Sequence, residues 1–484
     1  MRNFQKAKMV FSAILILLGQ AMMAGPNEDL VTACKMGDLA GAVKAIDEGA
    51  DVNFLDANGN PPIASAYFWP EITQLLLDKG ADPNKGNNPA LTGACGVYSV
   101  EVAQKLFDAG AIPNIPSLID PGVTFRTFIA NEKAKGKKAN QTIIKAYENA
   151  LATMKPTEME LVQIIVTGTN CVPCLKMALE KGANINFKSG DDALNVFLTF
   201  TMSQQERKEY CNTGAPNLES FGMKVPEWYR NLPDDKNGSA AKMLELLIKA
   251  GSDVNKPSLI GLTPLVVGLK GAASPAVRKA SKAEIVTMLL KNGADPKISA
   301  TQKLGKSDVT YYPICLAAEF GDKAIVEAML EKGANINTTT ETNSLGAYNG
   351  TWGGEGYTPL IIAILSNNFD LAGFLLDKGA DITKGSSGFA LLDIANSENK
   401  ATISTKNKTP IYWAIDKGNM ELIRKISDKM NWNFNPDFSF TAYTGNLVMQ
   451  TGWGPLKLKG KNNLSPSMYA DIVGNKEAKK YLQK

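Results

Sequence analysis

The chain carries one pair of cysteines at a spacing suited to redox chemistry, Cys171 and Cys174, with Val172 and Pro173 between them. Such a pair can cycle between a dithiol and a disulfide, and a thiol at the start of a helix has a lowered pKa, which makes it a better nucleophile. One interpretation is therefore a thiol-disulfide oxidoreductase that uses Cys171 and Cys174. The other is a disulfide between them with a local structural role.

Other catalytic chemistry is restricted by what the chain lacks. The 484 residues contain no histidine, so no Ser-His-Asp or Cys-His catalytic set and no histidine-held zinc or haem can be built. No Gly-x-x-x-x-Gly-Lys-Ser/Thr loop occurs. The glycine-rich residues 350–356 lack the preceding strand that a phosphate cradle requires, and we interpret them as a flexible finger. We therefore predict no catalytic residues, no metal and no cofactor.

The charge balance is close to neutral. The chain has 52 Lys+Arg against 48 Asp+Glu, and three of the basic residues, Arg2, Lys6 and Lys8, lie within residues 1–24. Without that segment 49 basic residues face 48 acidic ones. Because nucleic-acid binding draws on clustered Lys and Arg, we expect no nucleic-acid partner.

A short sequence tag that occurs eight times indicates the elements that position these residues. Each tag is a glycine followed by a sequence of the Ala-Asp-x-Asn type, and the tags begin at Gly49, Gly80, Gly110, Gly182, Gly251, Gly293, Gly333 and Gly379. Consecutive glycines lie 31, 30, 72, 69, 42, 40 and 46 residues apart. A glycine after an apolar run ends a helix in the left-handed conformation, and Asp or Asn beyond it closes a turn with its side chain. The tags therefore predict helix ends in a repeat array.

Matching start signals precede the tags. Thr358-Pro359, Tyr312-Pro313 and Thr409-Pro410 each stand directly before an apolar run. Threonine is a good N-cap, and proline is tolerated in the first turn, where its missing N–H would be unpaired anyway. Between a start and the next tag there is room for two short helices and a turn.

These units resemble ankyrin repeats. Residues 313–335 follow the family pattern almost position by position, with Cys315 where the pattern has histidine. Residues 30–53, 356–383 and 407–435 are close to the pattern, whereas the units near 116–155 and 188–255 are degraded, and these are either repeats or inserted elements. The resemblance covers most of the chain after residue 24. It implies an all-α solenoid of stacked helix-turn-helix units that binds another protein and has no catalytic activity.

The tag spacing also places the cysteine pair. Counting 12 residues back from Gly182 puts Asn170 at the turn between two helices, Pro173 in the first turn of the second helix and Cys174 near its buried face. This position favours a structural role over a redox one. Cys34, Cys95 and Cys315 fall in first helices of different repeats, and we expect them to be small core residues.

Residues 1–24 have the layout of a secretory signal peptide. Arg2, Lys6 and Lys8 precede an uncharged run from Met9 to Leu18, and small residues follow at Ala21 and Ala24. We therefore expect an exported protein of bacterial type, periplasmic or secreted. The alternative is an uncleaved membrane anchor, because Met22 is a poor residue at the third position before a cut after Ala24.

The pattern divides the chain into several segments. They are the signal peptide at 1–24, ankyrin-like repeats 1–3 at 25–114, degraded ankyrin-like repeats at 115–255 with an insertion at about 201–238, repeats at 256–435 with a finger insertion at 338–356, an aromatic finger insertion at 436–463, and a capping repeat at 464–484. The capping repeat has a polar second helix, which suits the end of a stack.

The two fingers are the predicted binding surface. The first, 338–356, carries Tyr348 and Trp352, with Tyr357 just beyond it. The second begins at 431, before its main part at 436–463, and carries Trp432, Phe434, Tyr443 and Trp453. Alternation around residues 437–441 predicts a hairpin turning near residues 444–446. Aromatic side chains anchor many interfaces, so we predict that these seven residues contact a protein partner.

Two alternatives remain open for the fingers and for the chain. The aromatic side chains either meet a partner or pack each finger against the repeats. The whole chain is either a protein-binding scaffold, expected to be a monomer, or a structural spacer in the cell envelope.

Overall fold

The computed structural model describes residues 25–119, 144–145, 157–166, 171–187, 192–200, 219, 223–230, 239–270, 282–304, 307–341, 353–393, 400–430, 439–444, 456–457, 461–462 and 464–483. The chain divides into two compact units, residues 1–252 with 274–276 and residues 253–273 with 277–484. The predicted signal peptide, residues 1–24, lies outside the described part.

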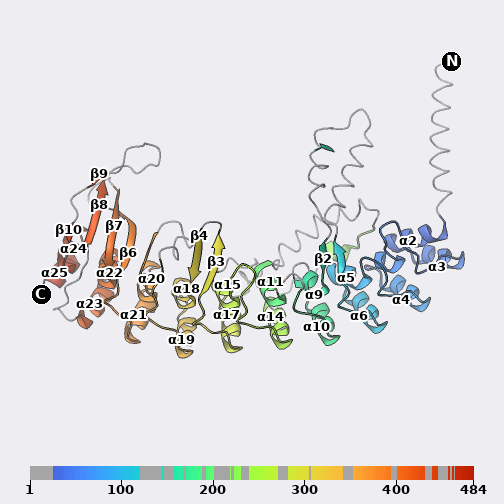
Figure 1. The fold of residues 1–484 in the computed structure, drawn as a ribbon, viewed down its shortest axis with the longest axis horizontal. Coiled ribbons are helices and arrows are strands. Elements are labelled where there is room, and N and C mark those ends of the chain that lie inside the picture. Colours follow the sequence, from blue (N-terminus) through green and yellow to red (C-terminus); the bar gives the residue numbers. More distant parts are fainter. Residues whose placement is uncertain are drawn as a thin grey trace, which may run out of the picture. The chain divides into compact units, whose positions relative to one another are not determined.

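Unit 1 consists of short helices that follow one another in antiparallel pairs (Figure 1, blue to green). Its helices are α2 (Pro26–Met36), α3 (Leu39–Asp47), the 3₁₀ helix η1 (Pro62–Ser65), α4 (Pro70–Asp78), α5 (Ala90–Gly96), α6 (Val100–Asp108), α9 (Leu161–Ile164), α10 (Val172–Glu180), α11 (Ala193–Phe200), α13 (Glu227–Arg230) and α14 (Ser239–Lys249). A small antiparallel pair, β1 (Ser117–Ile119) and β2 (Thr157–Met159), lies within the segment 115–255 that we predicted as degraded repeats.

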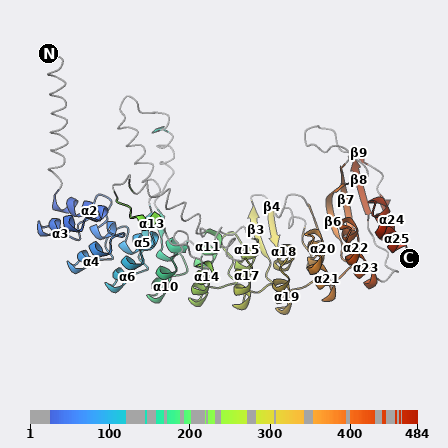
Figure 2. The same cartoon turned by 180° about the vertical axis from the view of Figure 1, so that it is seen from behind.

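Unit 2 repeats the helix pair more regularly. Its helices are α15 (Pro264–Lys270), α17 (Lys282–Lys291), α18 (Pro313–Phe320), α19 (Lys323–Glu331), α20 (Pro359–Leu365), α21 (Phe369–Asp377), α22 (Pro410–Lys417), α23 (Met420–Lys429), α24 (Pro466–Ile472) and α25 (Lys476–Leu482). The first helices α15, α18, α20, α22 and α24 contact one another in that order, and among the second helices α17 contacts α19, α21 contacts α23, and α23 contacts α25. Figure 2 shows the same two rows from behind.

The helix boundaries follow the predicted start and stop signals. Proline occupies the first turn of α15, α18, α20 and α22, and the Thr358 side chain caps α20 by accepting a hydrogen bond from the N–H of Ile361. All eight tag glycines have positive φ, between 78° at Gly182 and 97° at Gly49 and Gly251. The predictions of proline starts and glycine stops are confirmed.

The tags also do something that the sequence pattern did not predict. The asparagine at the end of one tag bridges to the next: Asn84 donates to the carbonyl oxygen of Gly110 at 3.1 Å and accepts from the N–H of Ile112 at 2.7 Å. Asn53, Asn114 and Asn255 make the same pair of bonds to the tags that follow them. Successive helix pairs are therefore joined by side chain to backbone bonds as well as by apolar contact.

The chain is helix-rich and fits an all-α repeat fold, but strands are added between the helix pairs. In unit 2 they are β3 (Ala300–Leu304), β4 (Ser307–Tyr311), β5 (Gly353–Glu355), β6 (Ser386–Asp393), β7 (Lys400–Lys408), β8 (Ser439–Thr444), β9 (Leu456–Lys457) and β10 (Lys461–Asn462). β3 and β4 pair with each other. The other six form one sheet in the order β10-β8-β7-β6-β5, with β9 also paired to β8.

One local expectation was wrong. The glycine-rich residues 353–355, which we interpreted as part of a flexible finger, form strand β5 because β6 offers it a paired edge. Of the turn predicted near 444–446, only Thr444 lies in the described part of the chain, where it ends β8, and the antiparallel partner β9 begins at Leu456. The position of the turn stays a prediction.

Candidate protein-binding surface

The two predicted fingers meet in a single sheet. The first finger contributes β5, and the second contributes β8, β9 and β10. Between them lie β6 and β7, which come from residues 386–408, a segment for which the sequence pattern predicted no strands. All pairings are antiparallel. In Figure 1 these strands stand on the side of unit 2 where the first helices lie, away from α19, α21 and α23.

Most of the predicted contact residues fall where no side chain is described. Tyr348, Trp352, Trp432, Phe434 and Trp453 lie outside the described residues. Tyr443 belongs to β8, and its backbone lies opposite Thr402 on one side and Lys457 on the other. The contact with a partner that we predict for these six residues stays a prediction.

Tyr357 is placed differently from its prediction. Its side chain is only 1% exposed, and its ring centroid lies 6.3 Å from that of Trp413. Its N–H donates to Thr340 Oγ1 at 3.1 Å, while its carbonyl oxygen accepts from the N–H of Thr340. Burial raises the pKa of Tyr357 to about 12. The ring therefore anchors the base of the first finger in the core and is not offered to a partner.

The central strand β7 is held by a buried lysine at its last residue. The Lys408 ammonium donates to the Asp416 carboxylate on α22 and to the Tyr469 hydroxyl on α24 at 3.0 Å. The Tyr469 hydroxyl in turn donates to Asp416 Oδ1 at 2.7 Å. The ammonium also lies 3.9 Å from the ring centroid of Trp413. The Lys408 side chain is fully buried, which lowers its pKa, although Asp416 opposes that shift.

A hydroxyl on the neighbouring strand completes this attachment. Ser386, the first residue of β6, accepts a hydrogen bond from Trp413 Nε1 at 3.0 Å. The Tyr412 hydroxyl donates to the carbonyl oxygen of Leu464, directly before the capping helix pair, at 2.5 Å. Strands β6 and β7, the helix α22 and the capping pair are thus joined through one polar cluster.

Sequence reasoning missed this cluster. Lys408 stands directly before a start signal, where nothing local marks it as buried, and Tyr469 lies 61 residues further along the chain. A signal for the strand itself was present, because residues 401–405 read Ala-Thr-Ile-Ser-Thr, a run rich in β-branched side chains. The 46-residue interval between Gly333 and Gly379 predicted an insertion only at the first finger, before the residues that form β6 and β7.

Among the strands that the structure describes, one edge of the sheet is only partly paired. Strand β5 covers only residues 387–389 of β6. Within the strands that the structure describes, residues 390–393 of β6 pair with β7 alone. An unpaired strand edge offers backbone N–H and C=O groups to an extended peptide, which is a common mode of protein recognition.

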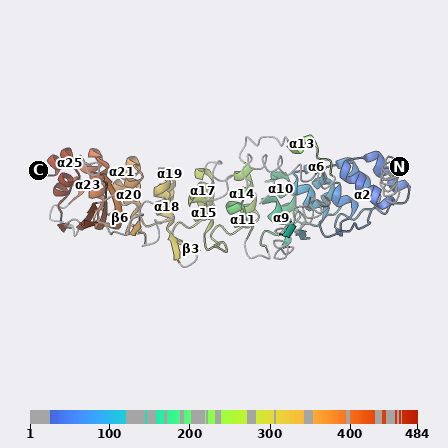
Figure 3. The ribbon, with the colours of Figure 1, turned by 90° about the horizontal axis from the view of Figure 1, so that it is seen from above.

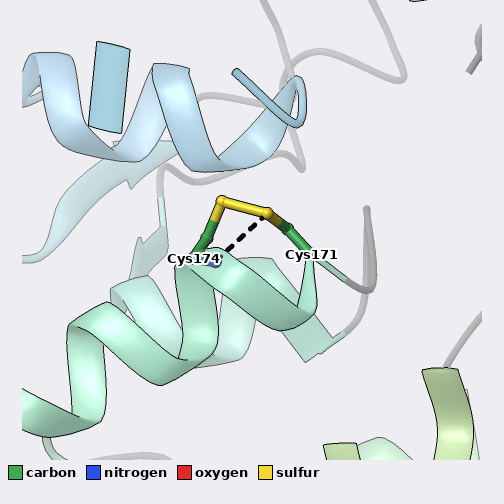
Figure 4. Close-up of a disulfide and its surroundings, with 2 residues drawn as sticks. All are labelled: Cys171 and Cys174. Carbon is green, nitrogen blue, oxygen red and sulfur yellow. Dashed lines mark hydrogen bonds between the residues drawn. A yellow bond between two sulfur atoms is a disulfide. The ribbon is translucent and has the colours of Figure 1, made fainter. Parts of the chain in front are cut away.

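The cysteine pair forms a disulfide at the start of α10 (Figure 4). Val172 is the first residue of α10 and Pro173 lies in its first turn, as the tag spacing predicted. Cys171 is the N-cap, and its Sγ accepts a hydrogen bond from the N–H of Cys174 at 3.3 Å. Both cysteines are 0% exposed. A redox substrate therefore has no access to either sulfur in this conformation.

The remaining described groups offer little for catalysis. The described residues contain no cluster of His, Cys, Asp and Glu that could hold a metal ion. A hollow of about 460 Å³ lies between α21 and α23, but its Lys425 is paired with Asp377 at 2.7 Å. No helix in the described part of the chain has the length and apolar character needed to cross a membrane.

Comparison with known proteins agrees with the repeat pattern. Residues 272–386 match the family described as ankyrin repeats (3 copies). Alpha-latrocrustotoxin-Lt1a of Latrodectus tredecimguttatus is 27% identical over 242 residues, which is 47% of this chain and 14% of the toxin. The E3 ubiquitin-protein ligase hecd-1 of Caenorhabditis elegans is 37% identical over 93 residues, 18% of this chain and 4% of the ligase.

The chain thus spans only a small part of the length of these relatives. Ankyrin repeats are generally modules for protein-protein interaction, and the family is generally non-enzymatic. The match over 272–386, lying on helix pairs that end in the tags described above, supports an ankyrin repeat protein.

Proposed function

We propose that this protein is a non-catalytic scaffold whose helix pairs form a solenoid and which binds another protein through its concave face and its fingers. The observation that carries the proposal is the sheet. Two aromatic-rich fingers, far apart in the sequence, supply strands to one element that is anchored to the repeats by Tyr357 and Lys408. An element that only filled space would not need two aromatic segments brought together.

Two properties of the sheet suit protein recognition. Aromatic side chains provide large contact area for little loss of side-chain entropy, which favours Tyr348, Trp352, Trp432, Phe434, Tyr443 and Trp453 as contact residues. The edge of β6 at residues 390–393, which pairs with β7 alone among the described strands, adds backbone hydrogen-bonding groups. Together they fit a partner that places an extended segment along the sheet.

The compartment and the oligomeric state are proposed from the sequence alone. Residues 1–24 act as a signal peptide, so the mature protein works in the periplasm or outside the cell without a membrane span. We also propose that it is a monomer. The near-neutral charge argues for a protein partner and against nucleic acid.

The test compares the double variant Trp352→Ala/Trp453→Ala with the unchanged protein in native cells, by cross-linking followed by mass spectrometry. The unchanged protein should yield a defined set of cross-linked proteins, and the double variant should lose that set. A control variant, Met468→Ala, removes a side chain that is 52% exposed on α24 and should keep the set. Identical cross-links for all three proteins would instead favour a structural spacer.

A further inference from the structure

One turn in unit 1 carries three consecutive aromatic residues, Tyr67, Phe68 and Trp69, between η1 and α4. The outer two rings spread over the neighbouring helix pairs. A Cβ atom added at Gly37, the C-cap of α2, would lie 2.6 Å from the Trp69 ring, and one added at Gly93 in α5 would lie 2.7 Å from Tyr67. Glycine at both positions therefore leaves room for the Trp69 and Tyr67 rings against adjacent helix pairs. Together with Phe68 these rings form one surface, here called the aromatic edge.

A segment from far along the chain lies on the aromatic edge. Residues 223–230 belong to the predicted insertion at about 201–238 and include the short helix α13. Met223 and Tyr229 pack with Phe68 and with Val97, the C-cap of α5. Figure 2 shows α13 beside α5, and Figure 3 shows it near α6. The N–H of Lys224 donates to the carbonyl oxygen of Lys35 at 3.0 Å, which docks the segment through its backbone. The Tyr67 hydroxyl donates to Met223 Sδ at 3.0 Å.

Rings complete the contact. The Phe68 centroid lies 5.8 Å from that of Trp228 and 5.3 Å from that of Tyr229, both near-perpendicular. Met223 and Tyr229 are 9% and 4% exposed, whereas Trp228 is 39% exposed. Two buried anchors six residues apart, with a backbone hydrogen bond beside the first, resemble the way in which short peptides bind to protein surfaces.

The segment leaves one group of the aromatic edge unsatisfied. Trp69 Nε1 is buried and has no hydrogen-bond acceptor among the described residues. What the segment places over the Trp69 ring is the ammonium of Lys224, 5.7 Å from the centroid, and an ammonium has only donors. A bound peptide that places an oxygen atom next to Trp69 Nε1 would make one more hydrogen bond to the aromatic edge than residues 223–230 make.

We propose that the aromatic edge is a second protein-binding surface, and that residues 223–230 occupy it as an internal substitute for a peptide segment of another protein. The partner segment carries a bulky apolar residue followed six residues later by an aromatic residue, and it has a carboxylate beside the apolar anchor, where this chain has Lys224. Partner binding displaces residues 223–230. This surface lies in unit 1 and does not depend on the fingers.

The test uses a fluorescent synthetic peptide with the sequence of residues 221–232, added to the full-length protein. In the protein variant Trp228→Ala/Tyr229→Ala the internal segment has lost its rings, so the peptide should bind at least tenfold more tightly to it than to the unchanged protein, measured by fluorescence anisotropy. A control peptide with the same two alanines should not bind. A peptide in which Lys224 is replaced by Glu should bind more tightly than the native peptide, because its carboxylate can reach Trp69 Nε1.

A second protein change checks the location of the site. Adding Tyr67→Phe to the double variant removes the hydroxyl that contacts Met223 and should weaken peptide binding. If the double variant does not fold, the single variant Trp228→Ala can replace it, because this side chain is partly exposed. The peptide should again bind more tightly to the variant than to the unchanged protein, but by a smaller factor. Equal peptide affinity for the unchanged and the changed protein, or no binding to either, would overturn the proposal.

Discussion

Asn255 donates its side-chain amide to the carbonyl oxygen of Gly293 at 2.9 Å and accepts a hydrogen bond from the N–H of Asp295 at 2.8 Å. Both partners belong to the next tag, 38 to 40 residues along the chain. The same asparagine is therefore part of its own turn and of the junction to the following helix pair. This double use explains why the last position of the tag is so often asparagine.

Replacing Asn255 by Ala should lower the free energy of unfolding by about 2 kcal/mol, because two hydrogen bonds worth roughly 1 kcal/mol each are lost. The loss is measured by urea denaturation and, locally, by faster hydrogen exchange at the Asp295 amide. The next tag allows the opposite change, which should raise the free energy of unfolding. Lys297 stands at the asparagine position, so Lys297→Asn should add about 1 kcal/mol by reaching Gly333 and Asn335. Unchanged exchange at Asp295 in Asn255→Ala would contradict the bridging role.

Replacing Lys408 by Met should destabilise unit 2 by about 3 to 5 kcal/mol, because Asp416 is left as a charge without its partner in a largely buried site. A double-mutant cycle with Asp416→Leu separates the pair from its surroundings. The loss of unfolding free energy in the double variant should be much smaller than the sum of the losses in the two single variants, since the double variant removes both charges together. Strict additivity would mean that the two charges do not interact.

Glu319, at the end of α18, makes the stability of unit 2 depend on pH. Burial raises the pKa of its carboxyl to about 7 from the ordinary value of 4.5, while the nearby Lys282 opposes the shift. Between these two pH values the folded state binds more protons than the unfolded state, so stability falls as the pH rises through this window.

Glu319→Gln should therefore stabilise the protein at pH 8 and leave its stability nearly unchanged at pH 4.5. The side chain is partly exposed, so after allowance for solvent screening we expect about 1 kcal/mol, or about 3 °C in Tm. Thermal denaturation at several pH values measures the effect. Glu331→Gln removes an equal charge from an exposed position and serves as the control. Parallel Tm curves for Glu319→Gln and the unchanged protein would refute the assignment.

The disulfide between Cys171 and Cys174 should stabilise the fold and not act as a redox centre. The double change Cys171→Ser/Cys174→Ser should lower the free energy of unfolding by about 2 kcal/mol, the chain-entropy value for so short a loop. The hydroxyl introduced by Cys171→Ser can still cap α10. Cys211 lies outside the described residues, so it is replaced by Ser to keep its thiol from being labelled. In this Cys211→Ser background the native protein should resist both dithiothreitol and thiol labelling at neutral pH. Cys34, Cys95 and Cys315 are buried, and burial raises the pKa of the Cys34 thiol to about 12. Rapid reduction of the native pair would revive the oxidoreductase interpretation.

What the sequence could predict is local. A glycine with positive φ, a proline in a first turn and a cysteine at the start of α10 each depend on neighbours within a few residues, and all three are found where the pattern placed them. The sheet depends instead on pairing in the order β8-β7-β6-β5 between strands whose individual sequences carry only a weak strand signal. The contact between Tyr67 and Met223 spans 156 residues, and no periodicity in the chain announces it.

The order of strands in the sheet has a consequence for synthesis. The first strand begins at Gly353 and the last ends at Asn462, while the helix pairs α20–α21 and α22–α23 lie between them in the chain. During synthesis the helix pairs can therefore fold one after another. Strands β6 and β7, however, have no β8 to pair with until the second finger has left the ribosome. During that interval the β7 edge is open to any neighbouring chain. Truncation before residue 439 should for this reason produce aggregation, even though every helix pair up to α23 is intact.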